Sequence, residues 1–304
     1  MKIFIAGGAG TVGSCIAQAL AEGALADEIV LYDIDHGLAS NHAMDLLESV
    51  CLTSAVEVRS GSMSDLRDSD IVIPVINIGS GNDHMKNLGQ TAPVLLELVG
   101  KVEKAAPEAV VITASNPVDI YNFLFYRNTG LPASRWLGFS YNDTVRFRRV
   151  LGSVLNLPPA RVGAFTIGEH GPTKVPLFSS VEVDGNRFPV SPEQKSDVLR
   201  NMKTWWDVFI NQTSDRRTAG WISAFGVAEM VRRIRGMDVS PIPCSCILDG
   251  QYGQSGVSLG VPAVLGRQGV AEILELKLEP DEQTAFEASA AKIRGLTKEV
   301  LSRY

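Results

Sequence analysis

The stretch KIFIAGGAGTVG, residues 2–13, decides how this chain folds. Its first five residues, Lys2–Ala6, are mostly apolar and predict a buried strand that runs directly into glycines. Gly8, Gly10 and Gly13 form the pattern G-x-G-x-x-G at the point where a helical pattern begins. Such glycines permit a tight turn and let backbone N–H groups approach a pyrophosphate at a helix N-terminus. The stretch therefore predicts a strand–turn–helix unit that binds a dinucleotide.

An acidic residue lies twenty residues beyond Gly13, where Asp33 ends the second apolar run. A carboxylate at this spacing accepts hydrogen bonds from the adenosine ribose hydroxyls and repels a 2'-phosphate, which predicts NAD rather than NADP as the cofactor. Asp35 is a nearby rival for the ribose contact, with poorer spacing. The structural alternative is an ordinary glycine turn followed by a surface aspartate.

Short apolar runs alternate with helical patterns through the first half of the chain. The runs that predict strands are Lys2–Ala6, Glu28–Asp33, Asp70–Ile76, Ala109–Ala114 and Trp136–Phe139. The stretches with helical spacing of apolar residues are Ser14–Leu25, Leu38–Val50, Gly89–Ala106 and Ile120–Asn128. This alternation predicts an α/β fold with a doubly wound parallel sheet and helices on both of its faces.

The second half of the chain has a different pattern. Val181–Val183, the turn Asp184-Gly185 and Arg187–Val190 predict a β-hairpin. Helical patterns follow over Pro192–Asn211 and Thr218–Arg235, two strand-like runs flank residues 250–256, and a last helix covers about Pro280–Leu301. Segregated strands and helices predict an α+β domain. The expected division lies near Tyr141, with one domain over residues 1–141 and the other over 142–304.

The composition excludes some partners. The chain has 304 residues, a formal net charge of -6 and 45% apolar residues, so it carries no basic excess to meet nucleic-acid phosphates. Its apolar runs are too short for a membrane span, and the first run is a strand rather than a signal peptide. The four cysteines, at 15, 51, 244 and 246, lack metal-ligand spacing. Their pattern favours a reduced compartment, and we expect a cytoplasmic protein.

The chain has four histidines, and His170 has the context of a proton-transfer group. It lies in IGEHGPTKVP, after the apolar run Val162–Ile167, where an exposed imidazole could take and give a proton near neutral pH. Asp143 and Arg146 are three residues apart on one expected helix face. An aspartate can orient an imidazole, and an arginine can grip a carboxylate through two hydrogen bonds. A surface Asp–Arg pair and an unrelated histidine remain the alternative.

Together these motifs resemble the lactate/malate dehydrogenase family over nearly the whole chain. The segments that carry the resemblance are GGAGTVG (7–13), LYD (31–33), AMDL (43–46), ASNPVDI (114–120), NDTVRFR (142–148), GEHG (168–171) and GVPAVLGRQGV (260–270). The resemblance implies a Rossmann-type NAD-binding domain, a mixed catalytic domain, a small 2-oxo or 2-hydroxy acid as substrate, and a homodimer or homotetramer.

The resemblance also implies roles for individual residues. His170 matches the family's catalytic histidine, Asp143 its carboxylate partner and Arg146 the clamp for the substrate carboxylate. Asn116 matches an asparagine near substrate and nicotinamide. The positions that match the cofactor site are Gly8, Gly10, Thr11, Val12, Gly13, Asp33, Gly79 and Asn116.

Two regions depart from the family pattern. The active-site loop normally carries an arginine that polarises the substrate carbonyl, but IGSGNDHMKNLGQ (78–90) contains none. Met85 takes the place of that arginine, between His84 and Lys86, and Lys86 could supply part of the charge without the guanidinium fork. In RTAGWISAFG (217–226), Trp221 takes a substrate-pocket position that is usually small. A one-residue slip in the alignment would instead leave Trp221 in the core.

Two functions follow from these observations. The first is an NAD-dependent oxidoreductase that interconverts a 2-hydroxy acid and its 2-oxo acid, with non-standard specificity. The second is a diverged NAD-binding protein with a sensory or structural role and little turnover. The altered loop favours the second, whereas the presence together of His170, Asp143 and Arg146 favours the first.

Overall fold

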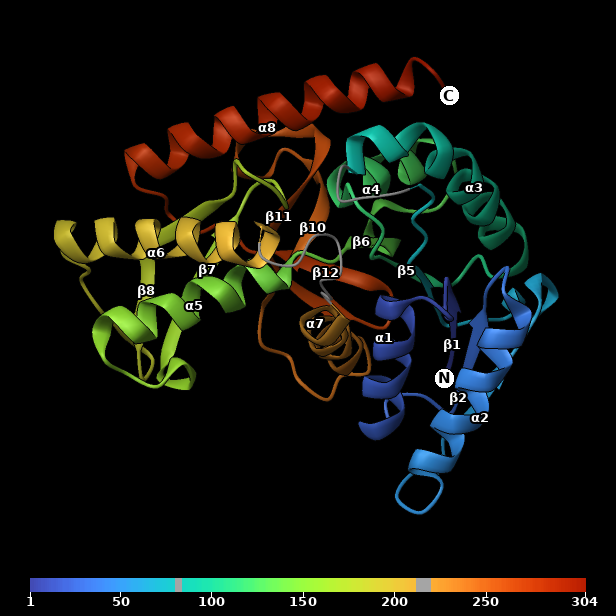
Figure 1. The fold of residues 1–304 in the computed structure, drawn as a ribbon. Helices are drawn as coiled ribbons and strands as arrows, with labels where there is room; N and C mark the ends of the chain where they lie inside the picture. The colour runs from blue at the N-terminus through green and yellow to red at the C-terminus, as the bar shows by residue number, and fades with distance from the viewer. Residues whose placement is uncertain (80–83, 212–219) are drawn as a thin grey trace.

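The computed structural model describes residues 1–79, 84–211 and 220–304. The first half alternates strands and helices (Figure 1). Its elements are β1 (Lys2–Ala6), α1 (Thr11–Glu22), β2 (Glu28–Tyr32), α2 (His36–Val50), β3 (Glu57–Ser60), β4 (Ile71–Pro74), α3 (His84–Ala105), β5 (Val110–Thr113), α4 (Val118–Arg127) and β6 (Trp136–Gly138).

The second half is built from longer elements. They are α5 (Tyr141–Leu155), β7 (Val162–Ile167), β8 (Val175–Val183), β9 (Asn186–Arg187), α6 (Pro192–Asn211), α7 (Gly220–Ile234), β10 (Ile242–Asp249), β11 (Ser255–Gly266), β12 (Gly269–Ile273) and α8 (Pro280–Leu301). The predicted hairpin turn is confirmed, because Asp184 and Gly185 have φ of 51° and 76°, as a tight hairpin turn requires. The expected start of α7 at Thr218 lies outside the described residues.

The main sheet has the predicted doubly wound topology. Its strands lie in the order β12-β11-β10-β6-β5-β4-β1-β2-β3, and β1 to β6 run parallel. The order reverses between β1 and β4, so both strands point their carboxyl ends at one crevice, where such sheets bind ligands. The sequence analysis did not name β3, a short edge strand with the sequence EVRS and little apolar signal.

The same sheet continues into the second half of the chain. β10 pairs antiparallel with β6 and with β11, and β11 pairs with β12, so these strands extend the first sheet. β10 is buried over Ile242–Leu248, which a strand inside a sheet requires. In contrast, β7, β8 and β9 form a separate three-stranded sheet. Because one sheet crosses residue 141, the expected division there stays a prediction.

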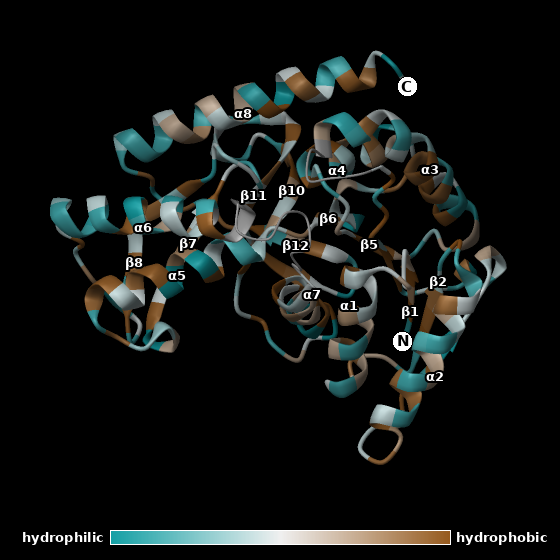
Figure 2. Ribbon diagram, in the orientation of Figure 1, coloured by the Kyte–Doolittle hydropathy of each residue, from teal (hydrophilic) through white to brown (hydrophobic). Residues whose placement is uncertain are grey.

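Alternating side chains of β1 feed two hydrophobic cores. Ile3 and Ile5 point into a core with α1, α7 and β10, whereas Phe4 and Ala6 point into a core with α3 and α4. This is the pattern of a strand that is buried on both faces. Figure 2 shows β1 and β2 as hydrophobic and the outer end of α6 as hydrophilic. A third core joins α5, α6, β7 and β8.

Helix α8 lies across the top of the molecule in Figure 1 and packs against α4, β8 and β11. It therefore ties the second half of the chain to the first. None of the helices in the described ranges is both long and apolar enough to span a bilayer.

Candidate active site

The glycine turn after β1 is held by two backbone hydrogen bonds. The N–H groups of Gly7 and Gly8 both donate to the carbonyl oxygen of Tyr32, at 2.8 and 3.0 Å. Gly7 has a φ of +92°, and a Cβ there would lie 2.5 Å from the carbonyl oxygen of Val75. A Cβ on Gly13 would lie 2.2 Å from the carbonyl oxygen of Gly7. The pattern G-x-G-x-x-G did not include Gly7, although the doubled glycine after the strand was a signal for it.

The structure separates the two aspartates that follow β2. Asp33 lies beside the glycine turn, where its Oδ2 accepts a 3.0 Å hydrogen bond from the N–H of Ala9. Asp35 caps the N-terminus of α2, where its Oδ1 accepts a 3.0 Å hydrogen bond from the N–H of Leu38. The capping role occupies Asp35, so Asp33 is the carboxylate beside the dinucleotide motif.

A cleft of about 1440 Å³ opens at the carboxyl edge of the parallel strands. Its lining includes Gly10, Thr11 and Val12 at the start of α1, residues 75–77 after β4, and Asn116 after β5. Together with Asp33, a helix N-terminus without bulky side chains fits the pyrophosphate and ribose of a dinucleotide. The same cleft continues to His170 and Arg146, so cofactor and proton-transfer groups share one space.

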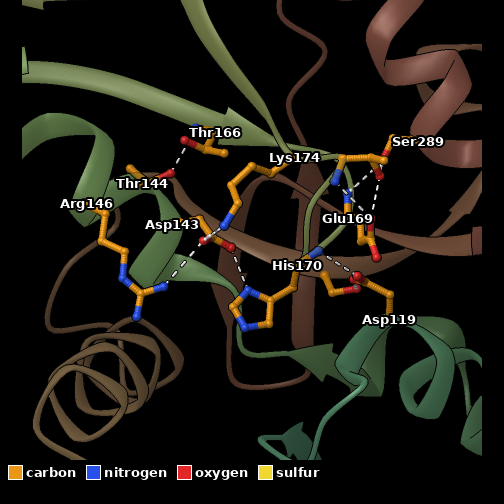
Figure 3. A network of polar contacts seen from close by, with 11 residues as sticks. Asp119, Asp143, Thr144, Arg146, Thr166, Glu169, His170, Lys174 and Ser289 are labelled. Atoms are coloured by element: carbon orange, nitrogen blue, oxygen red, sulfur yellow. Dashed lines mark hydrogen bonds and ion pairs between the residues drawn. The ribbon is translucent and has the colours of Figure 1, made fainter. Parts of the chain in front are cut away.

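The first turn of α5 places Asp143 against the loop that follows β7. Oδ2 of Asp143 lies 2.6 Å from Nδ1 of His170 (Figure 3), and Asp143 is only 3% exposed. Burial raises the pKa of Asp143, but the charges of His170 and Lys174 outweigh it and hold that pKa well below its usual range. An ionised carboxylate bound to Nδ1 fixes the tautomer and leaves Nε2 for a substrate proton.

Arg146 lies one helical turn after Asp143 on α5. One of its terminal nitrogens lies 3.6 Å from Oδ1 of Asp143, and the guanidinium lies 4.7 Å from the ring centroid of Trp205 on α6. A planar cation stacked on an indole is held in one orientation. Arg146 therefore presents a preoriented guanidinium to the cleft that contains His170.

Lys174 is a site residue that the sequence analysis missed. Its Nζ donates a 2.6 Å hydrogen bond to Oδ1 of Asp143, the oxygen that does not bind His170 (Figure 3). A lysine just before a strand has no sequence signal of this kind, because such side chains commonly extend into solvent.

Asp119 is a second residue that was missed. The backbone N–H of His170 donates a 2.7 Å hydrogen bond to its Oδ2, and the hydroxyl of Ser245 donates to its Oδ1. Asp119 is 2% exposed, and burial raises its pKa to about 6. Its place in ASNPVDI, after a buried strand, was the available signal.

The residue before His170 is fixed to α8. The N–H of Glu169 donates a 2.9 Å hydrogen bond to Oγ of Ser289, and both carboxylate oxygens of Glu169 lie 2.8 Å from Nζ of Lys292. Contacts from α4, α5 and α8 thus hold the loop that carries His170 on three sides.

Helix α7 contributes Ser223 to the described lining of the cleft, and not Trp221. Ser223 is 7% exposed, whereas Trp221 is 77% exposed. Positions two residues apart on an α-helix are rotated by about 200° around the helix axis, so the side chains of Trp221 and Ser223 leave opposite faces. The position two residues after Trp221 is therefore the one that faces the cleft.

Residues 78–90, which lack the family's arginine, become helical earlier along the chain than the sequence predicted. Helix α3 begins at His84 rather than near Gly89, so Met85 and Lys86 lie in its first turn. The described lining of the cleft includes Met85 but neither Lys86 nor Gly79. Gly79 has a φ of +118°, and the side chain of His84 lies outside the described residues.

Dehydrogenases that use a nicotinamide dinucleotide place an acid–base group beside the cofactor at this edge of a doubly wound sheet, and the cleft has that arrangement. Residues 1–138 match the family model for the NAD-binding domain of lactate/malate dehydrogenase, and residues 142–303 match the model for its alpha/beta C-terminal domain. The chain therefore belongs to the lactate/malate dehydrogenase family.

Relatives from both branches of the family match the chain end to end. An L-lactate dehydrogenase of Geobacillus thermodenitrificans is 33% identical over 95% of this chain and 94% of its own. A malate dehydrogenase of Halobacterium salinarum is 32% identical over 98% of this chain and 99% of its own. A Cryptosporidium parvum lactate dehydrogenase, solved with lactic acid and NAD, superposes with a TM-score of 0.91 at 29% identity, over 100% of this chain and 98% of that one.

These matches confirm the family that the sequence motifs indicated. The chain is an NAD-dependent oxidoreductase that acts on the CH–OH group of 2-hydroxy acids, and NAD is its cofactor. The chain is nearly equally similar to a lactate dehydrogenase, at 33% identity, and to a malate dehydrogenase, at 32% identity.

Proposed function

We propose that this chain interconverts a small 2-hydroxy acid and its 2-oxo acid, with His170 as the proton-transfer group. The observation that carries the proposal is the 2.6 Å contact between Nδ1 of His170 and Asp143, with Arg146 one turn away in the same cleft. Asn116 and the start of α1, with Gly10, Thr11 and Val12, line the cofactor side of that cleft. The proposed cofactor contacts are those of Gly8, Gly10, Thr11, Val12, Gly13, Asp33, Gly79 and Asn116.

Each residue has a defined part in the proposed reaction. The glycine turn and Asp33 would hold NAD, which would contribute hydride-transfer chemistry at the carbon that bears the oxygen. Nε2 of His170 donates a proton to the developing alkoxide in reduction and removes the hydroxyl proton in oxidation. Asp143 orients the ring and stabilises the imidazolium, while Arg146 binds the substrate carboxylate through two parallel hydrogen bonds.

We propose further that the specificity differs from that of a standard lactate or malate dehydrogenase. Residues 78–90 contain no arginine, and Met85 lines the cleft at the expected position of the carbonyl-polarising group. Loss of one preorganised donor to a developing oxyanion typically lowers kcat by about 100- to 1000-fold. The substrate is then a 2-oxo acid whose carbonyl is already activated or whose own group fills the space beside Met85.

A screen of NADH oxidation across 2-oxo acids that differ in length, charge and bulk tests this function. We expect turnover of at least one acid by the wild type and none by His170→Asn, whose NADH affinity stays near that of the wild type. Wild-type turnover by His170→Asn would contradict the assignment of His170.

The rival function is a diverged NAD-binding protein with little turnover, and the loop without arginine favours it. The His170–Asp143 pair and the stacked Arg146 favour the enzyme, because a protein without catalysis needs neither. NADH binding without consumption of any acid in the screen would support the rival.

We also propose a homodimer or homotetramer. Large apolar side chains are exposed on or beside α2 and α7, including Ile34 at 91%, Met44 at 64% and Trp221 at 77%. Light scattering of the purified chain measures its assembly state.

All four cysteines are free, which fits the proposed cytoplasmic location.

A further inference from the structure

Lys174 contacts the carboxylate of the His170–Asp143 pair. It follows the loop of His170, one residue before β8 begins, and its side chain reaches back to α5. There its Nζ lies 2.6 Å from Oδ1 of Asp143, while His170 binds Oδ2 (Figure 3). The side chains of Lys174 and Asp143 are 23% and 5% exposed, so water screens the pair weakly. One carboxylate is therefore shared between an ammonium group and the catalytic imidazole.

This sharing changes the charge that His170 meets. A carboxylate with no other partner attracts a neighbouring imidazolium with its full negative charge, and this attraction stabilises the imidazolium. Here the ammonium group of Lys174 offsets that charge, and the guanidinium of Arg146, at 3.6 Å, adds a second positive group on the same oxygen. The imidazolium form of His170 thus gains less from Asp143 than it would from an isolated aspartate.

The other acids around His170 are also engaged. Glu169, on the same loop, pairs with Lys292 of α8. Asp119, on α4, accepts hydrogen bonds from Ser245 and from the backbone of His170. The charge of the site is therefore most sensitive to Lys174, which contacts the carboxylate that binds the ring.

We propose that Lys174 is a positioning residue that weakens the stabilisation of the imidazolium form of His170 and so extends oxidation of the hydroxy acid to lower pH. The proposal rests on the proposed function of His170 as the acid–base group. Oxidation needs the neutral ring as proton acceptor, whereas reduction needs the imidazolium as proton donor. A cation on the far oxygen of Asp143 favours the neutral ring, so the form of His170 that oxidation needs persists to lower pH.

The test compares the pH profiles of kcat/KM for three proteins: the wild type, Lys174→Gln and Lys174→Arg. Lys174→Gln keeps a hydrogen-bond donor but removes the charge. We expect the midpoint for Lys174→Gln to rise by about one pH unit, as loss of a unit charge at this range implies. Lys174→Arg keeps the positive charge, so the midpoint of its pH profile should stay at the wild-type value. KM for the 2-oxo acid should change less than kcat, because Arg146 still holds the carboxylate.

Lys203→Met is the matched control, because Lys203 lines the same cleft and is exposed. It removes the same charge without a contact to Asp143, so its midpoint should stay at the wild-type value. Because burial raises the pKa of Asp119 to about 6, the comparison is repeated in an Asp119→Asn background to remove that titration. Lys174→Met replaces Lys174→Gln if the latter does not fold.

An NMR titration of the His170 ring, assigned through His170→Asn, needs no turnover. A midpoint that rises in Lys174→Gln supports the electrostatic role even if no acid is consumed, in which case only the proposed function fails. A folded Lys174→Gln with the wild-type midpoint in both measurements overturns the proposal, and so does an equal shift in Lys203→Met.

Discussion

The backbone N–H of His170 donates a 2.7 Å hydrogen bond to Oδ2 of Asp119, a carboxylate that is 2% exposed. The ring of the same histidine is held by Asp143, so separate acids fix its backbone and its side chain. The hydroxyl of Ser245, which donates to the other oxygen of Asp119, is bonded in turn to Oγ of Ser258 at 2.8 Å. The position of the proton-transfer group therefore depends on a polar network that reaches into β10 and β11 of the main sheet.

Asp119 should make the stability of the fold depend on pH. Burial raises the pKa of Asp119 from 3.8 to about 6, so the folded state prefers the protonated form. Its stabilising contribution is complete below pH ~4 and is lost as pH rises through ~6. Relative to Asp119→Asn, which cannot ionise, the wild type should lose about 2 kcal/mol of unfolding free energy between pH ~4.5 and ~7.5. Urea unfolding at the two pH values measures this difference, and a constant difference would show that Asp119 stays ionised.

Arg146→Lys should lower kcat/KM for the 2-oxo acid by about 10- to 100-fold, because the lysine keeps the charge but loses the two-pronged contact. The stacking on Trp205 is also lost. Arg149→Lys is the control, since Arg149 lies on the next turn of α5, lines the same cleft and is exposed. Steady-state kinetics of both variants measure the effect, and equal losses would mean that the carboxylate binds elsewhere.

Asp33→Asn should weaken NAD binding and reduce the preference for NAD over NADP. The variant lacks the charge that repels a 2'-phosphate and accepts ribose hydrogen bonds less strongly. Asp35→Asn makes the same chemical change at a helix cap, where asparagine serves equally well, and should leave both affinities unchanged. Tryptophan fluorescence titrations with both cofactors measure the affinities. If wild-type protein binds NADP as tightly as NAD, the role given to Asp33 is refuted.

Met85→Arg should raise turnover of pyruvate. Met85 lines the cleft in the first turn of α3, and an arginine there supplies a cation for the carbonyl oxygen. Such a donor is typically worth about 100- to 1000-fold in kcat, and Met85→Leu, which adds no charge, controls for the change of shape. An unchanged rate for pyruvate in Met85→Arg would show that this position does not reach the carbonyl.

Ser223, rather than Trp221, should control the size of the substrate pocket. Ser223→Leu adds bulk to the cleft wall and should disfavour longer 2-oxo acids relative to pyruvate by about 10-fold or more, as overpacking of a closed site does. Trp221→Ala removes an exposed side chain and should leave the ranking of acids unchanged. Substrate competition assays separate the two, and a broadened range in Trp221→Ala would restore the sequence-based assignment.

The strands of the first half other than β3, and the dinucleotide turn, could be predicted because their signals are local. Glycine spacing, apolar runs and the position of Asp33 each follow from a few adjacent residues. The edge strand β3 escaped because EVRS is short and half polar. Residues of α3 near its start were assigned to a loop, since the apolar pattern there is interrupted by glycine and asparagine.

The candidate site was predictable only in part. His170, Asp143 and Arg146 came from motifs, and the structure brings the three together. Lys174 had no motif signal, and Asp119 lay in the segment ASNPVDI without a signal for its contact with His170. These contacts span 31 and 51 residues and depend on how β8 and α4 pack. Trp221 illustrates a different limit, since a shift of two residues along a helix exchanges the inner face for the outer one.

The continuous sheet has a consequence for how the chain could be divided. β6 bonds to β5 on one side and to β10 on the other, through Leu137–Cys246 and Gly138–Ser245 pairs. A fragment that ends at residue 141 would leave the edge of β6 unpaired, next to the buried Trp136. Each half therefore supplies the strand that pairs with the open edge of the other, β6 from the first half and β10 from the second. A split or chimeric version of this protein would have to reassemble by strand complementation.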